Sequence, residues 1–349
     1  MIGAASPAAA AGDINVIASI KPVHSLVASV MAGVGKPTLI VEGAGSPHTY
    51  ALKPSQAQAL EQADVVFWIG HEIETFLEKP VETLGKKARV VELMDTEGLI
   101  KLKMREGGAF EAHAHDDHDD HDEKAAGAKK DDDHDHDHDH DDHADAKHDD
   151  HDDHDHKKKK KAGHDDHGHD DHAHHGGEDA HIWLDPANAK ILVGKIAATL
   201  SAADAKNAAT YKKNAAALSS RLDGLVAKVQ ATVKPVQDRG FIVFHDAYHY
   251  FEDRFGLEAA GAISVNPEVL PGAARVAEIK AKVKELGATC VFSEPQFEPK
   301  LVTVVTEGTN AKSGVLDPLG ASIDNGPELY FTLIESLGRS FSECLASAS

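Results

Sequence analysis

The segment from His113 to His175 contains only histidine, aspartate, glutamate, lysine, alanine and glycine. A segment of that composition has no large apolar side chain to bury, so it gains too little free energy to offset the entropy lost on ordering. We therefore expect residues 109–179 to be disordered in the absence of metal. The core of the protein must then be built by the residues on either side of this tract.

The tract also carries most of the charge. It holds 19 of the 25 histidines, and its 24 acidic residues against 9 lysines give it a net charge of −15, out of −22 for the whole chain. The rest of the chain is only mildly acidic. Binding to phosphates needs clustered lysine and arginine, so neither part predicts a nucleic acid partner.

Length and apolar runs limit what the remaining residues can form. A chain of 349 residues is long enough for two ordinary domains. No apolar run approaches the roughly 18 to 20 residues that cross a bilayer, so we expect no membrane-spanning segment. The first residues, MIGAASPAAAAGD, resemble the small-residue tail left near a signal cleavage site. We therefore expect an exported chain whose signal peptide has been removed.

Short β-branched runs alternate with helical stretches on both sides of the tract, which is the pattern of parallel α/β sheets. Between the two groups, apolar residues from Leu218 to Val229 recur at helical spacing and predict one long helix within some 45 residues. The fold class that follows is α/β, with two lobes of mostly parallel strands, a long linking helix and a ligand cleft between the lobes. The expected strands are 14–20, 38–42, 64–70, 89–93, 241–244, 288–293 and 313–316.

These patterns divide the chain into five segments. Order resumes after the tract at HIWLDP, where Asp185 can cap a helix that begins at Pro186. Ser55 and Gln58 form a capping-box pattern in the first lobe. The segments are a disordered N-terminal remnant (1–13), an N-terminal α/β lobe (14–108), the His/Asp-rich tract (109–179), a helical segment with the linking helix (180–239) and a C-terminal α/β lobe (240–349).

Six histidines lie outside the tract: His24, His48, His71, His181, His245 and His249. His48 and His245 follow expected strands, as Asp317 does, and the carboxyl ends of strands are where α/β sheets bind ligands. His181 precedes the helix that Asp185 caps. These four residues are candidate metal ligands, although their spacing matches no local metal-binding pattern. His24 and His249 lie near these residues in the sequence, and there is no other reason to consider them as ligands. We expect His71 at the surface.

Five motifs around these residues resemble, in the same order, the periplasmic zinc-binding proteins of ABC importers, the ZnuA type. The resemblance runs from about residue 14 to 349 and includes a charged, His-rich insertion before the second motif. It implies two α/β lobes, a rigid linking helix and a zinc site in the cleft of a periplasmic protein. It also implies delivery of the ion to a membrane permease with its ATPase, and we expect a monomer. The motifs are GAGSPHTYALKPS (43–55), HIWLDP (181–186), FHDAYHYF (244–251), FSEPQF (292–297) and GVLDPLG (314–320).

By this resemblance the metal ligands are His48, His181 and His245. The aspartate that completes the site in manganese-binding relatives corresponds to Asp317, which is a fourth ligand or lies just beyond bonding distance. Some zinc-binding members carry a glutamate before the first histidine, where this chain has Pro47, so Asp317 or water must fill the fourth position. Three imidazoles and one oxygen suit tetrahedral Zn²⁺, whereas more oxygen favours manganese. We predict Zn²⁺, with a manganese or iron importer component as the alternative.

A zinc ion with three protein ligands and a water is also found in enzymes. Asp246 adjoins His245, but an aspartate between a strand and a helix has an ordinary capping role. We find no other obvious general base near the ligands in the sequence, and we predict no enzymatic activity. Glu294 and Asp185 are candidates for orienting a ligand histidine, or for ordinary capping and loop hydrogen bonds.

The chain has two cysteines, Cys290 and Cys344. In a reducing compartment they would be a reduced buried pair, whereas in an exported chain we expect a disulfide. The resemblance supports the disulfide, because many members of the family have one.

We expect the tract to collect zinc with modest affinity and to pass it to the cleft. Imidazoles beside carboxylates offer many interchangeable sites, each weakened by the entropy of ordering the chain. A flexible tether of this length spans roughly 40 to 45 Å, enough to reach the cleft mouth. The alternatives are a solvated spacer and, for the whole chain, a zinc buffer or sensor without a transporter. The predicted secondary ligands are His134, His136, His138, His140, His143, His148, His151, His154 and His156.

Overall fold

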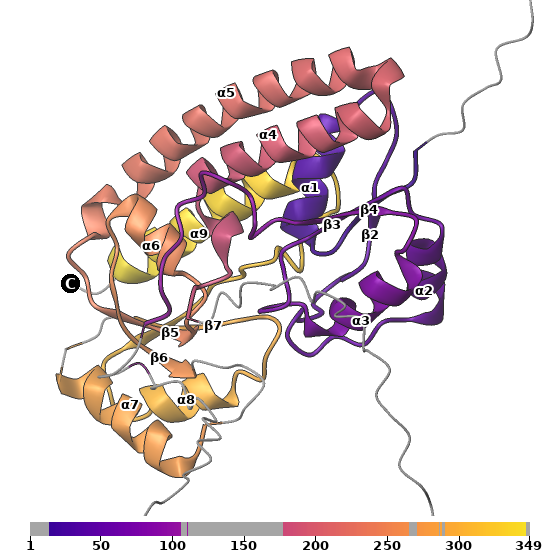
Figure 1. The fold of residues 1–349 in the computed structure, drawn as a ribbon. Coiled ribbons are helices and arrows are strands. Elements are labelled where there is room, and N and C mark those ends of the chain that lie inside the picture. Colours follow the sequence, from indigo (N-terminus) through magenta and orange to yellow (C-terminus); the bar gives the residue numbers. More distant parts are fainter. Residues whose placement is uncertain are drawn as a thin grey trace, which may run out of the picture. The chain divides into compact units, whose positions relative to one another are not determined.

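Figure 1 shows the fold in a computed structural model, which describes residues 14–105, 110, 177–264, 271–285, 287 and 290–346. These residues belong to one compact unit. The N-terminal remnant and the tract histidines from His134 to His156 lie outside the described residues, so their predictions are not addressed by the structure. Among the helices of the described part, none combines the length and the apolar character needed to cross a membrane.

The first half of the chain forms a sheet of four parallel strands, the N-terminal sheet, in the order β2-β1-β3-β4. Both central strands are buried along their whole length, as expected of a parallel sheet that is covered on both faces. The elements are β1 (Val16–Ala18), α1 (Lys21–Val30), β2 (Thr38–Leu39), α2 (Pro54–Glu61), β3 (Val65–Trp68), α3 (Thr75–Leu84) and β4 (Arg89–Glu92).

The second half forms another sheet of four parallel strands, the C-terminal sheet, in the order β6-β5-β7-β8. A C-terminal helix, α9 (Leu329–Ala346), follows the last strand. The other elements are β5 (Phe241–His245), α6 (His249–Phe255), β6 (Ala259–Ser264), α7 (Ala273–Glu285), β7 (Cys290–Ser293), α8 (Lys300–Thr306) and β8 (Lys312–Val315).

Two helices, α4 (Pro186–Ala203) and α5 (Ala208–Val233), come between the strands of the two sheets in the sequence. In space they pack side by side (Figure 1). The expected long helix is α5, which contains the apolar residues from Leu218 to Val229, and the separate helix α4 precedes it. The chain leaves α4 at Asp204, whose carboxylate accepts hydrogen bonds from the Asn207 side chain at 2.7 Å and the Tyr211 hydroxyl at 2.8 Å. Aspartate forms such local bonds more readily than it continues a helix, and a turn of 3₁₀ helix then starts α5.

One hydrophobic core joins the two sheets through these helices. It runs from Phe67 of β3 through Leu222 of α5 and Phe341 of α9 to Phe292 of β7. A smaller cluster lies under α7 and α8 on the C-terminal sheet. Because protein cores are packed at the density of organic crystals, a shared core resists a wide hinge motion between the sheets.

The α/β fold class with two parallel sheets is confirmed, and each expected strand overlaps an observed one. Strand β6 was not expected, because its sequence AAGAIS consists mostly of small residues with little preference for strands. The cap at Asp185 is confirmed: its side chain accepts a hydrogen bond from the Ala187 N–H at 2.7 Å. The capping box at Ser55 is wrong, because α2 already begins at Pro54 and Gln56 accepts from the Lys53 N–H.

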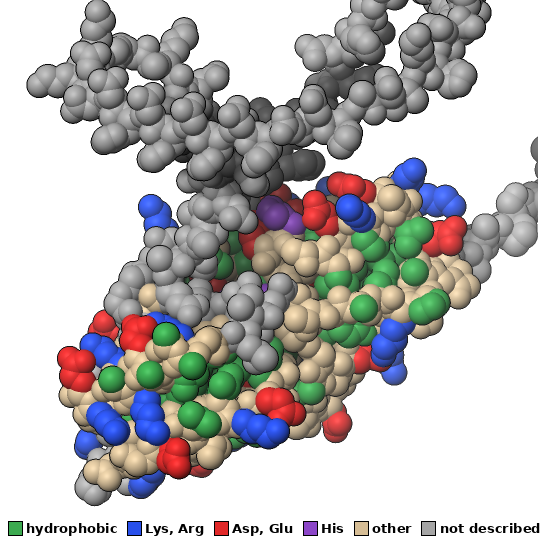
Figure 2. All heavy atoms as spheres, turned by 90° about the horizontal axis from the view of Figure 1, so that it is seen from below, with side chains coloured by type: hydrophobic (Ala, Val, Ile, Leu, Met, Phe, Trp, Pro, Cys, Tyr) green, Lys and Arg blue, Asp and Glu red, His purple; other side chains and the backbone are tan. Residues whose placement is uncertain are grey.

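Charged side chains of both signs are interspersed on the face of the molecule that Figure 2 draws. This distribution agrees with the low net charge outside the tract, where subtracting −15 from −22 leaves −7.

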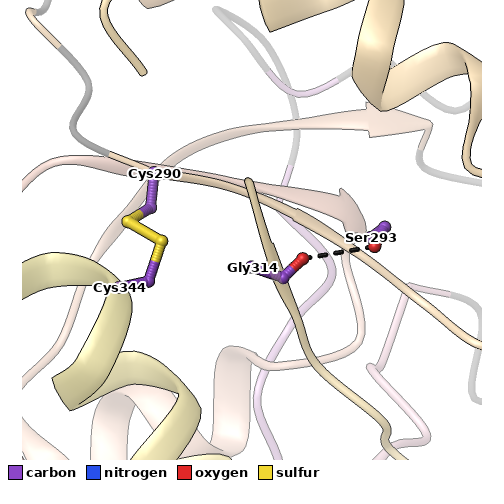
Figure 3. Close-up of a disulfide and its surroundings, with 4 residues drawn as sticks. All are labelled: Cys290, Ser293, Gly314 and Cys344. Carbon is purple, nitrogen blue, oxygen red and sulfur yellow. Dashed lines mark hydrogen bonds between the residues drawn. A yellow bond between two sulfur atoms is a disulfide. The ribbon is translucent and has the colours of Figure 1, made fainter. Parts of the chain in front are cut away.

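The Cys290–Cys344 disulfide ties β7 to α9 (Figure 3). Beside it, the Ser293 hydroxyl donates a hydrogen bond of 3.2 Å to the Gly314 carbonyl on β8. A side chain at Gly314 would not fit, because its Cβ would lie 2.5 Å from the Phe292 ring. The bond therefore joins the last helix to a tightly packed part of the C-terminal sheet.

Breaking this disulfide should lower the free energy of unfolding by about 4 kcal/mol, because it closes a loop of 54 residues in the unfolded chain. Urea unfolding of the oxidised chain, the dithiothreitol-reduced chain and the Cys290→Ala/Cys344→Ala variant measures this loss. The reduced chain serves as a control without any change of sequence. A loss below about 1 kcal/mol in both would contradict a stabilising role.

Candidate metal site

The structure brings His48, His181 and His245 together. Each offers one ring nitrogen, and the three nitrogens lie within 4.8 Å of one another. His245 is the last residue of β5, His181 directly precedes the 3₁₀ turn that leads into α4, and His48 lies in the loop between β2 and α2. The ring centroids are 5.3 to 5.8 Å apart. Residues from three distant parts of the sequence thus form one cluster.

Two carboxylates hold two of these rings from behind. Asp179 Oδ1 lies 2.7 Å from His181 Nδ1, and Glu294 Oε1 lies 2.6 Å from His245 Nδ1. The second pair follows from strand register: β5 and β7 are parallel neighbours that pair Phe241 with Cys290, and four residues further along the chain come His245, which ends β5, and Glu294, which directly follows β7. A carboxylate at Nδ1 selects the tautomer that carries its proton there, which leaves Nε2 with a free lone pair.

The Nε2 atoms of His181 and His245 face each other at 3.4 Å. With both Nδ1 atoms donating to carboxylates, two lone pairs point into the same small space. Such an arrangement is repulsive unless a proton or a cation lies between the two nitrogens. The Asp179 and Glu294 carboxylates contribute two negative charges beside the rings, which a divalent cation would balance.

The pKa values of the cluster differ in direction. Burial and the two neighbouring imidazoles lower the pKa of His48 well below 6.5. Burial by itself lowers the pKa of His245 also, but the Glu294 carboxylate outweighs it, and the pKa of His245 lies above 6.5. His48 is therefore neutral and ready to bind a cation at neutral pH, while a proton competes with a cation at His245.

The three rings line a small cavity. The centre of a water-sized ligand can move within about 10 Å³ there, which is room for about one such ligand. Trp183, Phe297 and Leu319 contribute apolar walls, and Glu294 and Gln296 contribute polar atoms. Pro47 also lines the cavity, at the position where a carboxylate would be needed for a ligand next to His48.

Asp317 does not join the three histidines in the metal-ligand group. Its Oδ1 accepts hydrogen bonds from Leu319 N–H, Gly320 N–H and the Gln296 amide, and its Oδ2 accepts one from Ala321 N–H, at 2.6 to 3.1 Å. Oδ1 thus accepts three of these hydrogen bonds and Oδ2 accepts one, so both carboxylate oxygens are engaged. The side chain is held in its own loop.

Both ends of the tract meet beside the cluster. Met104 N–H donates to the Gly177 carbonyl and Asp179 N–H donates to the Leu102 carbonyl, each at 2.8 Å, so the two ends form a short antiparallel stem. The stem therefore places Asp179, the partner of His181. The sequence carries a signal for this partner, an acidic residue two positions before a candidate ligand.

Arg105 fixes the other end of the stem. It donates to Asp246, the residue after His245, at 3.0 Å and to Glu252 at 2.7 Å. Asp246 was expected to start a helix, but α6 begins three residues later, at His249, and the carboxylate pairs with Arg105 instead. Nothing in the sequence near Arg105 indicates this contact.

The other candidates lie apart from the three histidines. Asp185 pairs with Arg254 and caps α4, so it does not orient a ligand. His24 is buried, with Nε2 3.1 Å from the Pro37 carbonyl, and His249 is the first residue of α6. His71, expected at the surface, is partly buried and forms a second group of possible ligands with Glu72 and Glu92.

Comparisons with known proteins give a consistent result. A family model described as "Zinc-uptake complex component A periplasmic" matches residues 16–344. A protein of Brucella suis biovar 1 (strain 1330), named "High-affinity zinc uptake system protein ZnuA", is 52% identical over 332 residues, covering 95% of this chain and 92% of its own.

Solved structures share the fold. One described as "Crystal structure of ZnuA" aligns with a TM-score of 0.68 at 20% identity, covering 95% of this chain and 99% of its own. Another, "Structure of the SBP FpvC from pseudomonas aeruginosa in complex with Mn2+", aligns with a TM-score of 0.69 at 17% identity, covering 97% and 100%. At these identities the structural likeness speaks for the fold alone.

Replacing Glu294 by glutamine should move the pH dependence of zinc binding. A zinc ion must displace the proton of His245, so affinity falls as the pH drops through a pKa that lies above 6.5. Glu294→Gln removes the charge that raises this pKa, so the fall should begin at a lower pH. The same change should weaken binding at pH 8 by about 10-fold to 100-fold, because the ring loses its partner.

Competition with a chelator between pH 5.5 and 8 measures both effects. Glu298→Gln, at an exposed position on the same loop, is the matched control and should behave like the unaltered chain. If the affinity of the Glu294 variant fell over the same pH range as that of the control, the role given to Glu294 would be wrong.

Proposed function

The chain belongs to the family of periplasmic zinc-uptake components, and we propose from this that it captures Zn²⁺ between His48, His181 and His245 and delivers it to an ABC importer. In this proposal zinc is the cargo. The three histidines bind the ion, and Asp179 and Glu294 orient two of the rings. Asp317 does not supply the fourth ligand.

The observation that carries the proposal is the 3.4 Å separation of the two facing Nε2 atoms. Two nitrogens bound to tetrahedral zinc at 2.0 to 2.1 Å lie about 3.3 to 3.4 Å apart. This separation of the His181 and His245 nitrogens supports zinc as the ion, and the carboxylates behind these two rings favour the same orientation. Two anionic partners also offset the charge of a divalent ion in a buried site.

The ligand set supports zinc over manganese. Three imidazole nitrogens suit zinc, whereas manganese favours sites rich in carboxylate and water oxygens. Asp317, the carboxylate that could have added an oxygen ligand, is engaged by three N–H groups of its own loop and by the Gln296 amide. We therefore propose that the chain prefers Zn²⁺ to Mn²⁺ when both are offered.

The tract serves as a collector of lower affinity in this proposal. The stem at residues 102–104 and 177–179 supports this role, because both ends of the tract leave the described structure within a few residues of His181 and beside Asp246. Ions held by the tract thus stay close to the site. Tract binding requires neutral histidines and should fade as the pH falls below about 6.5.

The proposed setting is the periplasm, with a membrane permease and its ATPase as partners and no catalytic role. The family name supports the compartment and the uptake complex. The buried carboxylates at the site support binding rather than hydrolysis, since Glu294 and Asp179 both face ring nitrogens and Asp246 is neutralised by Arg105. We propose that the binding component itself is a monomer.

Replacing His245 by alanine should abolish tight zinc binding, because it removes one of three ligands and leaves Glu294 buried without its partner. His249→Ala, four residues away and outside the ligand group, is the matched control and should retain the affinity of the unaltered chain. Competition with a high-affinity chelator, which keeps the weaker sites empty, measures both. Equal affinity in the two variants would refute the proposed site.

Deleting residues 113–175 should leave one tight zinc site and remove the weaker ones. The stem supports this expectation, because Met104 and Gly177 already lie hydrogen-bonded to each other and a short connection can join them. Isothermal titration of the full and shortened chains counts the sites. Loss of the tight site on deletion would contradict the separation of collector and cleft.

A further inference from the structure

Gln296 stands at the cavity with one polar atom that has no partner. Its amide nitrogen donates a hydrogen bond of 2.9 Å to Asp317 Oδ1. Its amide oxygen, Oε1, is buried and accepts no hydrogen bond within the described part of the chain. The residue lines the same cavity as His48, His181 and His245.

The direction of this amide is set by chemistry rather than by chance. A carboxylate can only accept, so the end of the amide that faces Asp317 must be the NH₂ group and Oε1 must point away from it. Strand register brings the two residues together: β7 and β8 are parallel and pair Ser293 with Val315, so the positions just beyond both strands are neighbours. Asp317 is in turn fixed by three backbone N–H groups of its loop.

An unpartnered, buried acceptor is costly, because it loses its bonds to water on folding and gains nothing in return, at about 1 to 3 kcal/mol. What such an oxygen lacks is a donor. The cavity has room for about one water-sized ligand. A water that is bound to a metal ion is polarised and is a stronger donor than an ordinary one.

Glu294 is the other acidic or amide residue of the cavity wall. Its Oε1 faces His245 Nδ1, whereas its Oε2 is buried and accepts no hydrogen bond within the described part of the chain. Gln296 Oε1 and Glu294 Oε2 are therefore both acceptors that lack a donor, and one water has two protons to donate.

We propose that Gln296 Oε1 accepts a hydrogen bond from a water that occupies the fourth position of the bound zinc ion. Asp317 is then a positioning residue, which holds the amide in the orientation that makes its oxygen face the water. This inference rests on the proposed function, since it assumes that the three histidines bind zinc. Gln296 then favours an ion that is tetrahedral and binds one water. It thereby favours zinc over a metal that needs more oxygen ligands.

The test compares Gln296→Leu, Gln58→Leu and His245→Ala in the full chain. Leucine removes the acceptor at similar size, and Gln58 is an exposed glutamine on α2 that serves as the control. Competition with a chelator gives the zinc affinity of the tight site. One equivalent of Co²⁺ reports on the ligands through its visible absorption. The thermal midpoint of the metal-free chain reports on folding.

Gln296→Leu should weaken zinc binding about 10-fold or more and change the Co²⁺ spectrum, while the metal-free midpoint stays that of the control. Affinity within twofold of the control and an unchanged spectrum would overturn the role of Gln296, while a loss of binding in His245→Ala would show that the site itself stands. If His245→Ala bound zinc as tightly as the control, the proposed function would fail first.

A second measurement follows the Gln296 amide in the unaltered chain. In the unaltered chain with isotopically labelled glutamine side chains, the first equivalent of Zn²⁺ should shift one side-chain amide signal by nuclear magnetic resonance. That signal should be absent from a Gln296→Asn chain. If every glutamine amide kept its signal position on zinc binding, the proposal would be overturned even where Gln296→Leu failed to fold.

Discussion

The hydrogen bonds from two carboxylates to the Nδ1 atoms of His181 and His245 are the interactions on which the site depends. They choose the tautomer, fix the plane of each ring and turn both Nε2 atoms toward one point, where they lie 3.4 Å apart. A histidine without such a partner can rotate and can carry its proton on either nitrogen. In the proposed site, Asp179 and Glu294 thus prepare two histidines as two of the ligands of a tetrahedral ion.

The fold supplies these partners by two different routes. Glu294 reaches His245 because β5 and β7 are parallel neighbours whose ends lie side by side. This register would bring together any two side chains at those positions. Asp179 reaches His181 through a stem that closes the long tract, and the same stem carries Arg105 to Asp246. The hydrophobic core that spans both sheets then keeps the two contributions at a fixed separation. A preformed site of this kind spends little binding free energy on ordering the protein.

Sequence patterns predicted the parallel sheets because short β-branched runs alternate with helical stretches, and they made His48 and His245 candidates because those residues follow such runs. The two-helix arrangement at Asp204 was missed, since helical periodicity continues across it and only the side-chain bonds of Asp204 break it. Strand β6 was missed because alanine and glycine give no signal. Asp179 is placed by the stem, in which Met104 bonds to Gly177, and Arg105 is placed by its bond to Asp246. Both contacts join residues more than 60 positions apart, and the periodicity of the sequence does not record such contacts.

Ligand identity was harder to predict than ligand position. Asp317 follows β8 as His245 follows β5, and nothing in the sequence distinguishes a carboxylate that binds metal from one that organises its own loop. The four donors around Asp317 are the reason why we propose that it organises its loop and does not bind the ion. Anomalous diffraction at the zinc edge, from crystals of the zinc-loaded chain, tests the central claim most directly. The account predicts a peak of full occupancy at about 2.0 to 2.1 Å from one nitrogen each of His48, His181 and His245. A fully occupied peak elsewhere, with these three rings bound to no metal, would contradict it.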